Sequence, residues 1–296
     1  MFSFYEDFIQ TEPWPIVKKA FVTAEIGINH NGDMALVRQL IDLAAEKGCD
    51  AVKFQKRTID IVYSPEVLAA HRESPWGTTQ REQKEGLELN REQYDEIDTY
   101  CRKKGLAWYA SAWDIPSLHF LRPYNLAYNK VASAMLTHKE FINEVIAEKK
   151  LTFIGIGMSD YGDIDEVVAK FKAGGCPFIL MHCVSEYPAP NEVLNLRQIV
   201  ELRQRYNCPV GYSGHEMTMI PGVIAVMMGA VAIERHITLN HAMYGSDQAA
   251  SLEPRGLETL MNYMAQIPIT MGDGQRRVTA TEFSNAKKLR YWWREA

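Results

Sequence analysis

The sequence predicts an α/β protein, a TIM (β/α)8 barrel with a short N-terminal extension. Eight short apolar runs that are typical of strands alternate with amphipathic segments that are typical of helices, and this alternation favours parallel strand pairing. The length of 296 residues fits one barrel, which usually needs about 250 residues. A doubly wound sheet is the alternative, but no Gly-x-Gly-x-x-Gly follows the first strand.

The individual elements follow from these patterns in chain order. Strands are predicted at residues 21–28, 51–55, 107–112, 127–132, 152–158, 178–184, 209–213 and 230–237. Helices are predicted at residues 34–47, 91–104, 139–148, 163–172, 196–206, 221–228 and 254–266. Glycine follows a basic last turn at Lys47-Gly48 and Lys104-Gly105, as expected where helices end. We therefore expect an extension at 1–19, a barrel at 20–285 and a tail at 286–296.

Composition argues against several classes of protein. The net charge of −5 and the lack of a basic stripe argue against nucleic-acid binding. No apolar run approaches the roughly 18 residues that a membrane span needs. The five cysteines are odd in number and scattered, which is typical of reduced thiols, and acidic residues stand where a signal peptide would be basic. We expect a cytoplasmic protein.

Polar residues gather where the predicted strands end, the face of a barrel that carries catalysis. His215 and His236 close two successive strands, so their imidazoles are predicted to lie side by side, an arrangement that can hold a divalent metal. Lys53 and Lys130 interrupt apolar strands, where a charge is costly unless it is paired or used. The two lysines therefore indicate an anionic ligand such as a phosphate or carboxylate.

Five motifs in order resemble the sialic acid synthase family over residues 20 to about 285. They are Ala-Glu-Ile-Gly-Ile-Asn-His-Asn-Gly at 24–32, Val-Lys-Phe-Gln at 52–55, His-Cys-Val-Ser-Glu-Tyr-Pro at 182–188, Ser-Gly-His at 213–215 and Glu-Arg-His at 234–236. The resemblance implies a barrel enzyme, a transferase that joins phosphoenolpyruvate to an aldose such as N-acetylmannosamine. The product would be a sialic-acid-like 2-keto-3-deoxy sugar acid, with release of phosphate.

The resemblance also implies roles for single residues. His215 and His236 match metal ligands, with Mn²⁺ as the expected ion and Mg²⁺ or Co²⁺ as alternatives. Glu25 and Gln55 match positions at the reacting end, and Asp247 matches an acidic residue of the active site. Positions that bind phosphoenolpyruvate are matched by Lys53, Lys130, Ser133, Ser185, Tyr187 and Ser213, and His182 is a further candidate for substrate binding.

Three features depart from the family pattern. Met135 stands where the family has a glutamate, for which Glu25 or Glu186 is the candidate substitute. Gly214 replaces an aspartate. The sequence printed ends at residue 296, so we expect no counterpart of the family's C-terminal antifreeze-like domain. The long charged connection at 58–89 is then either a lid that selects the sugar or a solvated surface insertion.

Other interpretations remain open at this point. The chain could be a metal-dependent barrel aldolase or hydrolase, or a binding homologue without catalysis. His182 and His30 fit a buried structural role as well as a site role, and strand alternation predicts that Cys183 faces the helices. Glu234 and Arg235 could form a structural pair. The aromatic residues within 1–19 are expected to plug the barrel or pack on a neighbour, and we expect a homo-oligomer.

Overall fold

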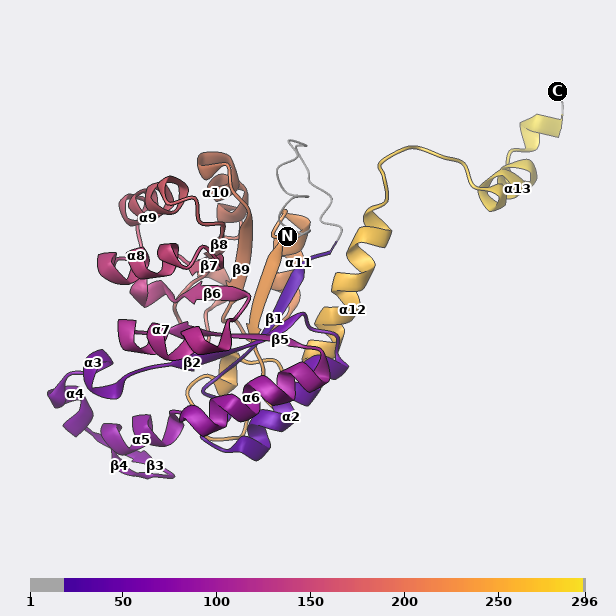
Figure 1. Cartoon of the computed structure of the whole chain (residues 1–296). Coiled ribbons are helices and arrows are strands. Elements are labelled where there is room, and N and C mark those ends of the chain that lie inside the picture. The colour runs from indigo at the N-terminus through magenta and orange to yellow at the C-terminus, as the bar shows by residue number, and fades with distance from the viewer. Residues whose placement is uncertain (1–18, 295–296) are drawn as a thin grey trace.

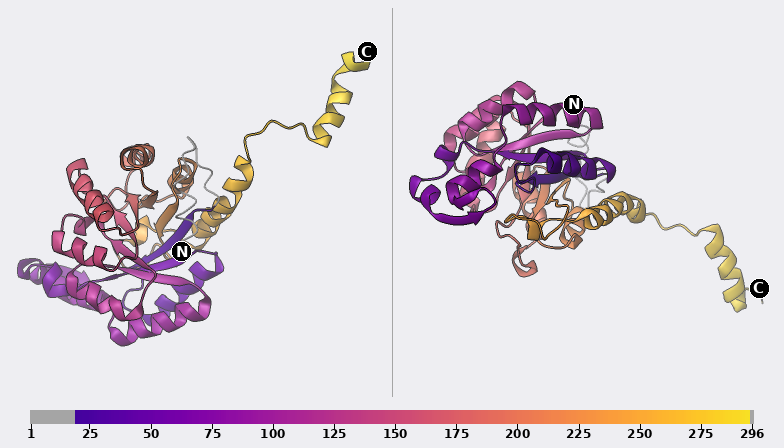
Figure 2. Two further views of the ribbon diagram at one scale, coloured as in Figure 1. Left: turned by 45° about the horizontal axis from the view of Figure 1, so that its top comes forward. Right: turned by 90° about the horizontal axis from the view of Figure 1, so that it is seen from below.

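A computed structural model describes residues 19–294, and within them the barrel prediction is confirmed. Eight parallel strands close in the spatial order β1-β10-β9-β8-β7-β6-β5-β2 (Figures 1 and 2). The strands are β1 (Phe21–Gly27), β2 (Ala51–Lys56), β5 (Ala107–Ala112), β6 (Tyr128–Val131), β7 (Leu151–Gly155), β8 (Phe178–His182), β9 (Val210–Gly214) and β10 (Ala232–His236). Each overlaps its predicted range.

Helices cover the outside of this barrel. The predicted ones are α2 (Met34–Glu46), α6 (Arg91–Lys104), α8 (Lys139–Ala147), α9 (Tyr161–Ala173), α10 (Gln198–Tyr206), α11 (Ile220–Met227) and α12 (Pro254–Met271). Between β5 and β6 the prediction omitted α7 (Ile115–Leu121), whose 7 residues are too few to show a helical period. Its start does carry a signal, because the Asp114 side chain accepts a hydrogen bond from the backbone N–H of Ser117.

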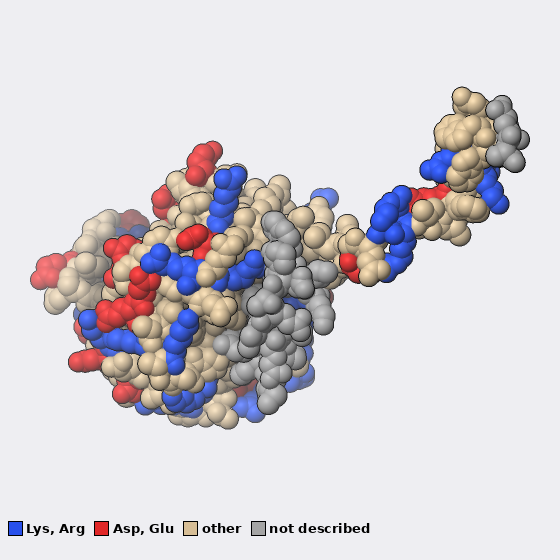
Figure 3. Space-filling model, turned by 90° about the horizontal axis from the view of Figure 1, so that it is seen from above, with Lys and Arg blue, Asp and Glu red and all other residues tan. Residues whose placement is uncertain are grey.

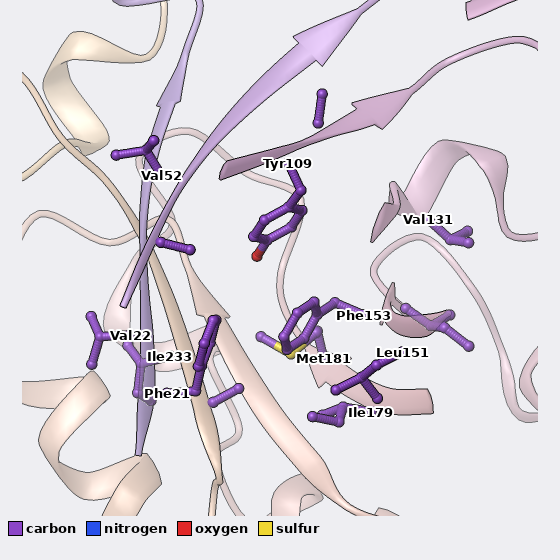
Figure 4. Packing of buried hydrophobic residues seen from close by; sticks show 14 of the residues in the cluster. Phe21, Val22, Val52, Tyr109, Val131, Leu151, Phe153, Ile179, Met181 and Ile233 are labelled. Carbon is purple, nitrogen blue, oxygen red and sulfur yellow. The ribbon is translucent and has the colours of Figure 1, made fainter. Parts of the chain in front are cut away.

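An aromatic layer fills the barrel below the strand ends. Phe21 stacks on Phe153 with ring centroids 5.7 Å apart, and Tyr109 stacks on Phe153 at 5.5 Å. Figure 4 shows these rings meeting between the strands. Further along β1 and β2, beyond Thr23, the inward side chains are Glu25 and Lys53, which pair in register. The charged layer thus lies directly above a closed apolar floor.

The connection after β2 is ordered rather than a bare loop. It forms α3 (Ile59–Val62), α4 (Pro65–Ala69), the antiparallel pair β3 (His71–Ser74) and β4 (Gly77–Thr79), and α5 (Gln80–Leu87). Trp76 packs edge-on against Tyr244 at 5.7 Å between ring centroids, and Gln83 Nε2 donates to Tyr244 Oη at 3.3 Å. We call residues 58–89 the insertion. It is anchored on the loop that follows β10.

The last helices differ in their relation to the barrel. Buried side chains of α12 include Leu257, Leu260 and Met264, whereas the described residues after α12 are almost all exposed. Helix α13 (Ala280–Leu289) stands away from the barrel in both views of Figure 2. The boundary predicted at residue 285 therefore falls inside α13, and the barrel core ends with α12. The predicted extension at 1–19 lies almost wholly outside the described residues.

The surface gives two further observations. Basic and acidic side chains are interspersed over the barrel face shown in Figure 3. Among residues 19–294, none of the helices has the length and apolar content to span a bilayer.

Candidate active site

A cavity of about 70 Å³ opens among the carboxyl ends of the strands. Most of the predicted site residues line it, namely Glu25, Lys53, Gln55, Lys130, Ser133, Ser185, Tyr187, Ser213, His215 and His236. Ser111, Trp113, Cys183 and Glu234 also contribute to its wall. The sequence motifs, which are far apart in the chain, thus meet at one end of the barrel.

Two lysines and two glutamates form the floor of the cavity. Lys53 Nζ lies 2.8 Å from Glu25 Oε2 and 3.7 Å from Glu234 Oε1, and Lys130 Nζ lies 3.1 Å from Glu234 Oε2. Burial alone would raise the pKa of Glu234, but Lys130 and Lys53 outweigh it and lower that pKa to about 2. Burial would likewise lower the pKa of Lys53, yet Glu234 and Glu25 raise it. Glu234 and Lys53 therefore keep their charges at neutral pH.

Backbone geometry at the end of β1 makes room for these groups. Gln55 Nε2 donates to Glu25 Oε1 at 2.8 Å, and Arg57 in turn donates to Gln55 Oε1. Gly27 has φ +55°, and a Cβ there would lie 3.1 Å from Glu25 Oε1 and 3.3 Å from His236 Cε1. Glycine at this position is required both by its backbone conformation and by the close approach of the site.

The two predicted metal ligands lie side by side, with ring centroids 5.7 Å apart. His215 Nδ1 donates to the Val184 carbonyl at 2.6 Å, so Nε2 carries the lone pair and accepts from Tyr187 Oη at 3.0 Å. Burial, followed by the charge of His236, lowers the pKa of His215 to about 3. His236 Nδ1 is buried without a hydrogen-bond partner. Both rings are suited to binding a cation.

Asp247 lies beside the cavity rather than in its wall. Its Oδ2 is 3.7 Å from His236 Nδ1, and Ser246 Oγ donates to its Oδ1 at 2.8 Å. Among the described residues, no group of three or more His, Cys, Asp or Glu side chains has the arrangement of a metal cluster. The protein itself thus offers a pair of imidazoles with one carboxylate nearby.

The prediction that Cys183 faces the helices is wrong. Its Sγ lies 3.3 Å from Ser133 Oγ in the cavity wall, and the backbone N–H of Gly157 donates to both, at 3.2 Å and 3.1 Å. The inward positions of β8 continue from Met181 to Cys183, so His182 must face outward.

His182 and Glu186 were predicted to belong to the site, but neither side chain lines this cavity. His182 Nε2 donates to the Leu194 carbonyl at 2.7 Å, and burial lowers the pKa of the ring. Glu186 is exposed and, like His182, lines an adjoining open groove that shares Met158, Cys183 and Ser185 with the cavity.

Glu234 and Arg235 do not pair with each other, contrary to expectation. Glu234 faces the cavity, while Arg235 faces outward and its Nη1 lies 2.8 Å from Glu216 Oε1. Tyr212 Oη also donates to Glu216 Oε2 at 2.7 Å. A Cβ on Gly214 would lie 2.6 Å from Glu216 Oε2. The carboxylate of Glu216 therefore occupies the space beside Gly214.

Other polar residues near the strand ends serve the scaffold. Asn29 Nδ2 donates to the Ile237 carbonyl at 2.9 Å and to Ser251 Oγ at 2.8 Å, which ties β1 to the loop after β10. His30 Nδ1 accepts from the backbone N–H of Gly32 at 2.9 Å. Met135 is buried in the apolar core and does not line the cavity. Asn29 and His30 thus fix the loops around the site without lining the cavity.

Comparison with known proteins identifies the family of the chain. A model of the NeuB family matches residues 40–276. N,N'-diacetyllegionaminic acid synthase from Campylobacter jejuni is 32% identical over 93% of this chain and 84% of its own. Human N-acetylneuraminate-9-phosphate synthase is 33% identical over 91% of this chain and 76% of its own.

A solved structure shares the whole architecture. The N-acetylneuraminic acid (sialic acid) synthetase of Leptospira borgpetersenii superposes with a TM-score of 0.80 and 27% identity, over 92% of this chain and 93% of that one. The family model spans most of the chain, and the relatives exceed 30% identity over nine-tenths of it. The chain therefore belongs to the NeuB family of enzymes.

Proposed function

We propose that this protein condenses phosphoenolpyruvate with an N-acetylated amino aldose to form a sialic-acid-like 2-keto-3-deoxy sugar acid and inorganic phosphate. The observation that carries the proposal is the placement of two lysines and two imidazoles around one buried cavity in a NeuB-family chain. In this reaction, carbon 3 of the enol bonds to the aldehyde carbon of the sugar. Water adds to carbon 2, and the bond from carbon 2 to the phosphate oxygen then breaks.

The floor of the cavity supplies the charges that phosphoenolpyruvate needs. Lys53 and Lys130 are nearly enclosed by protein, so their attraction for carboxylate and phosphate oxygens is screened less than in water. The same cavity is lined by residues with hydroxyl groups that can donate further hydrogen bonds, namely Ser133, Ser185, Tyr187 and Ser213. Glu25 and Glu234 hold the two ammonium groups in place before substrate arrives.

The donor set fits a divalent cation at His215 and His236. The hydrogen bond from His215 Nδ1 to Val184 fixes the tautomer, and His236 retains a buried nitrogen without a partner. Mn²⁺ is the ion we propose, with Mg²⁺ and Co²⁺ as alternatives, and water or substrate would complete its ligands. Bound there, the cation would supply Lewis-acid polarisation of the aldehyde carbonyl.

Two carboxylates remain to handle protons. Glu25 is held by Lys53 and Gln55 at the floor, and Asp247 stands beside His236 at the rim. We assign Glu25 to the enol end of the reaction and Asp247 to the sugar end. The first would stabilise charge at carbon 2, and the second would exchange a proton with the new hydroxyl group of the sugar.

The test is phosphate release with a panel of aldoses, followed by mass measurement of the product. Protein stripped with EDTA should release phosphate only at background, and Mn²⁺ should restore it. His236→Ala should abolish this recovery, whereas His119→Ala, which alters an exposed histidine paired with Glu144, should not.

Other results would favour the other interpretations. Cleavage of a sugar acid without phosphate release would indicate an aldolase. Binding of Mn²⁺ and phosphoenolpyruvate with no turnover of any aldose would indicate a binding homologue. The relatives differ in whether the product carries a phosphate, because the human enzyme is named for a 9-phosphate product and the Campylobacter jejuni enzyme is not.

A further inference from the structure

The hydroxyl groups that line the cavity differ in what their hydrogens do. Those of Ser111, Tyr187 and Ser213 donate to acceptors of the protein, at 3.5 Å, 3.0 Å and 3.0 Å. A hydroxyl group has one hydrogen and two lone pairs, so each of these three would have to leave its partner before it could donate to an anion. Ser133 and Ser185 have no such acceptor among the described residues, and their hydrogens remain for a ligand.

Ser133 is held in the cavity wall by contacts with two neighbouring strand ends. Its Oγ accepts from the backbone N–H of Gly157 at 3.1 Å and lies 3.3 Å from Cys183 Sγ. A Cβ on Gly157 would lie 2.4 Å from Ser185 Oγ and 3.1 Å from Ser133 Oγ, so only glycine leaves room for these side chains. Ser133, Gly157 and Cys183 follow β6, β7 and β8, which are adjacent in the barrel.

The contacts of Cys183 indicate the direction of its hydrogen bond with Ser133. Its Sγ accepts from the backbone N–H of Gly157 at 3.2 Å, and among residues 19–294 Ser133 Oγ is the only acceptor that the thiol reaches. If the thiol donates, both lone pairs of Ser133 Oγ are occupied and the hydroxyl hydrogen is left to point into the cavity. The opposite direction would leave the S–H group without an acceptor and would present a lone pair to an anion.

We propose that Cys183 is a positioning residue that turns the hydroxyl hydrogen of Ser133 toward an anionic group of bound phosphoenolpyruvate. This inference rests on the proposed function. Cys183 acts through Ser133 and needs no contact with the ligand. A donor that already points at the anion loses less rotational freedom on binding than a freely turning hydroxyl group, so the site binds the anion more tightly. A thiol is a weak donor, and the expected contribution is correspondingly modest.

The experiment measures the Kd of phosphoenolpyruvate by calorimetry with the full-length protein and Mn²⁺, together with KM for both substrates. Cys183→Ala should raise the Kd about fivefold and leave KM for the aldose unchanged. Cys183→Ser keeps a donor and should retain most of the affinity. Cys208→Ala is the matched control, because Cys208 is 8% exposed against 7% for Cys183 but precedes β9 at the opposite end of the barrel. It should leave the Kd unchanged.

A double-mutant cycle separates positioning from packing. Ser133→Ala should raise the Kd about 10–100-fold, because it removes a donor to a charged group. Cys183→Ala should add nothing in that background, since the hydrogen that the thiol directs is gone. A full fivefold effect there would overturn the inference, as would an unchanged Kd in Cys183→Ala alone.

The conservative variant and the unmodified protein give two further outcomes. If Cys183→Ser binds phosphoenolpyruvate as weakly as Cys183→Ala does, the volume of the sulfur rather than its hydrogen is what matters, and the inference fails. If the unmodified protein does not bind phosphoenolpyruvate at all, the proposed function fails instead, and the two failures are thus distinguishable.

Discussion

Glu234 and Arg235 are consecutive on β10, yet their charges are compensated in opposite ways. Glu234 shares its carboxylate among Lys53, Lys130 and Ser213 at the edge of a cavity. Arg235 is fully buried between sheet and helices, where it contacts Glu216 and donates to the backbone carbonyls of Glu216 and Thr218. The residues around Glu234, which we call the inner cluster, border the cavity, so a substrate anion can replace Glu234 as the partner of a lysine. Arg235 and Glu216, which we call the outer cluster, do not border the cavity and hold β9 and β10 together behind the histidines.

Arg235→Met should give the largest effect if the outer cluster serves stability. It leaves Glu216 buried and charged, which should cost about 3–5 kcal/mol of unfolding free energy in thermal or urea denaturation. Arg38→Met is the control, because Arg38 and Glu96 are both more than two-fifths exposed and such pairs contribute about 0–1 kcal/mol.

The double variant with Arg235→Met and Glu216→Gln guards against a simple failure to fold. It removes both charges and should recover part of the loss. A single variant no less stable than the surface control would show that the outer pair does not hold the strands.

Lys130→Met should have the next largest effect, this time on catalysis. Lys53 still lies 3.7 Å from Glu234, so the fold should lose less stability than with Arg235→Met. The loss of one ammonium group from the anion site should lower kcat/KM for phosphoenolpyruvate by about 10²–10³-fold. Unchanged kinetics together with a large fall in melting temperature would assign the inner cluster to the scaffold instead.

Ser213→Ala should give the smallest effect of the three. It removes one hydrogen bond of 3.0 Å to Glu234, whose carboxylate keeps both lysines. We expect about a tenfold fall in kcat/KM and no measurable change in melting temperature. A fall as large as that of Lys130→Met would mean that the hydroxyl group itself contacts the reacting atoms.

The barrel and most of its site followed from local patterns. Strand periodicity, helix ends and the positions of Lys53 and His215 are all short-range signals, and closing the barrel brings them together. The alternation along β10 that places His236 inward also places Glu234 inward and Arg235 outward, which separates the two charges of the proposed pair. For β8, the prediction takes His182 as the inward-facing residue, and alternation then places Cys183 on the helix side, which is the wrong face.

Contacts between distant segments were beyond the reach of sequence reasoning. No pattern in residues 58–89 indicates that Trp76 and Gln83 anchor on Tyr244, more than 150 residues later in the chain. The pairing of Arg235 with Glu216 likewise depends on a loop that folds back over Gly214. Such contacts decide which charges are left for a substrate, so they also decide what the site can select.

The close approach of Glu216 to Gly214 makes the two positions interdependent in any change of sequence. Gly214→Asp alone would force a side chain to within 2.6 Å of Glu216 Oε2 and set two carboxylates against one guanidinium. Glu216→Ala alone would strip Arg235 of its counter-ion. Each single change disturbs the contact between Arg235 and Glu216, so we expect substitutions at positions 214 and 216 to be tolerated better together than alone.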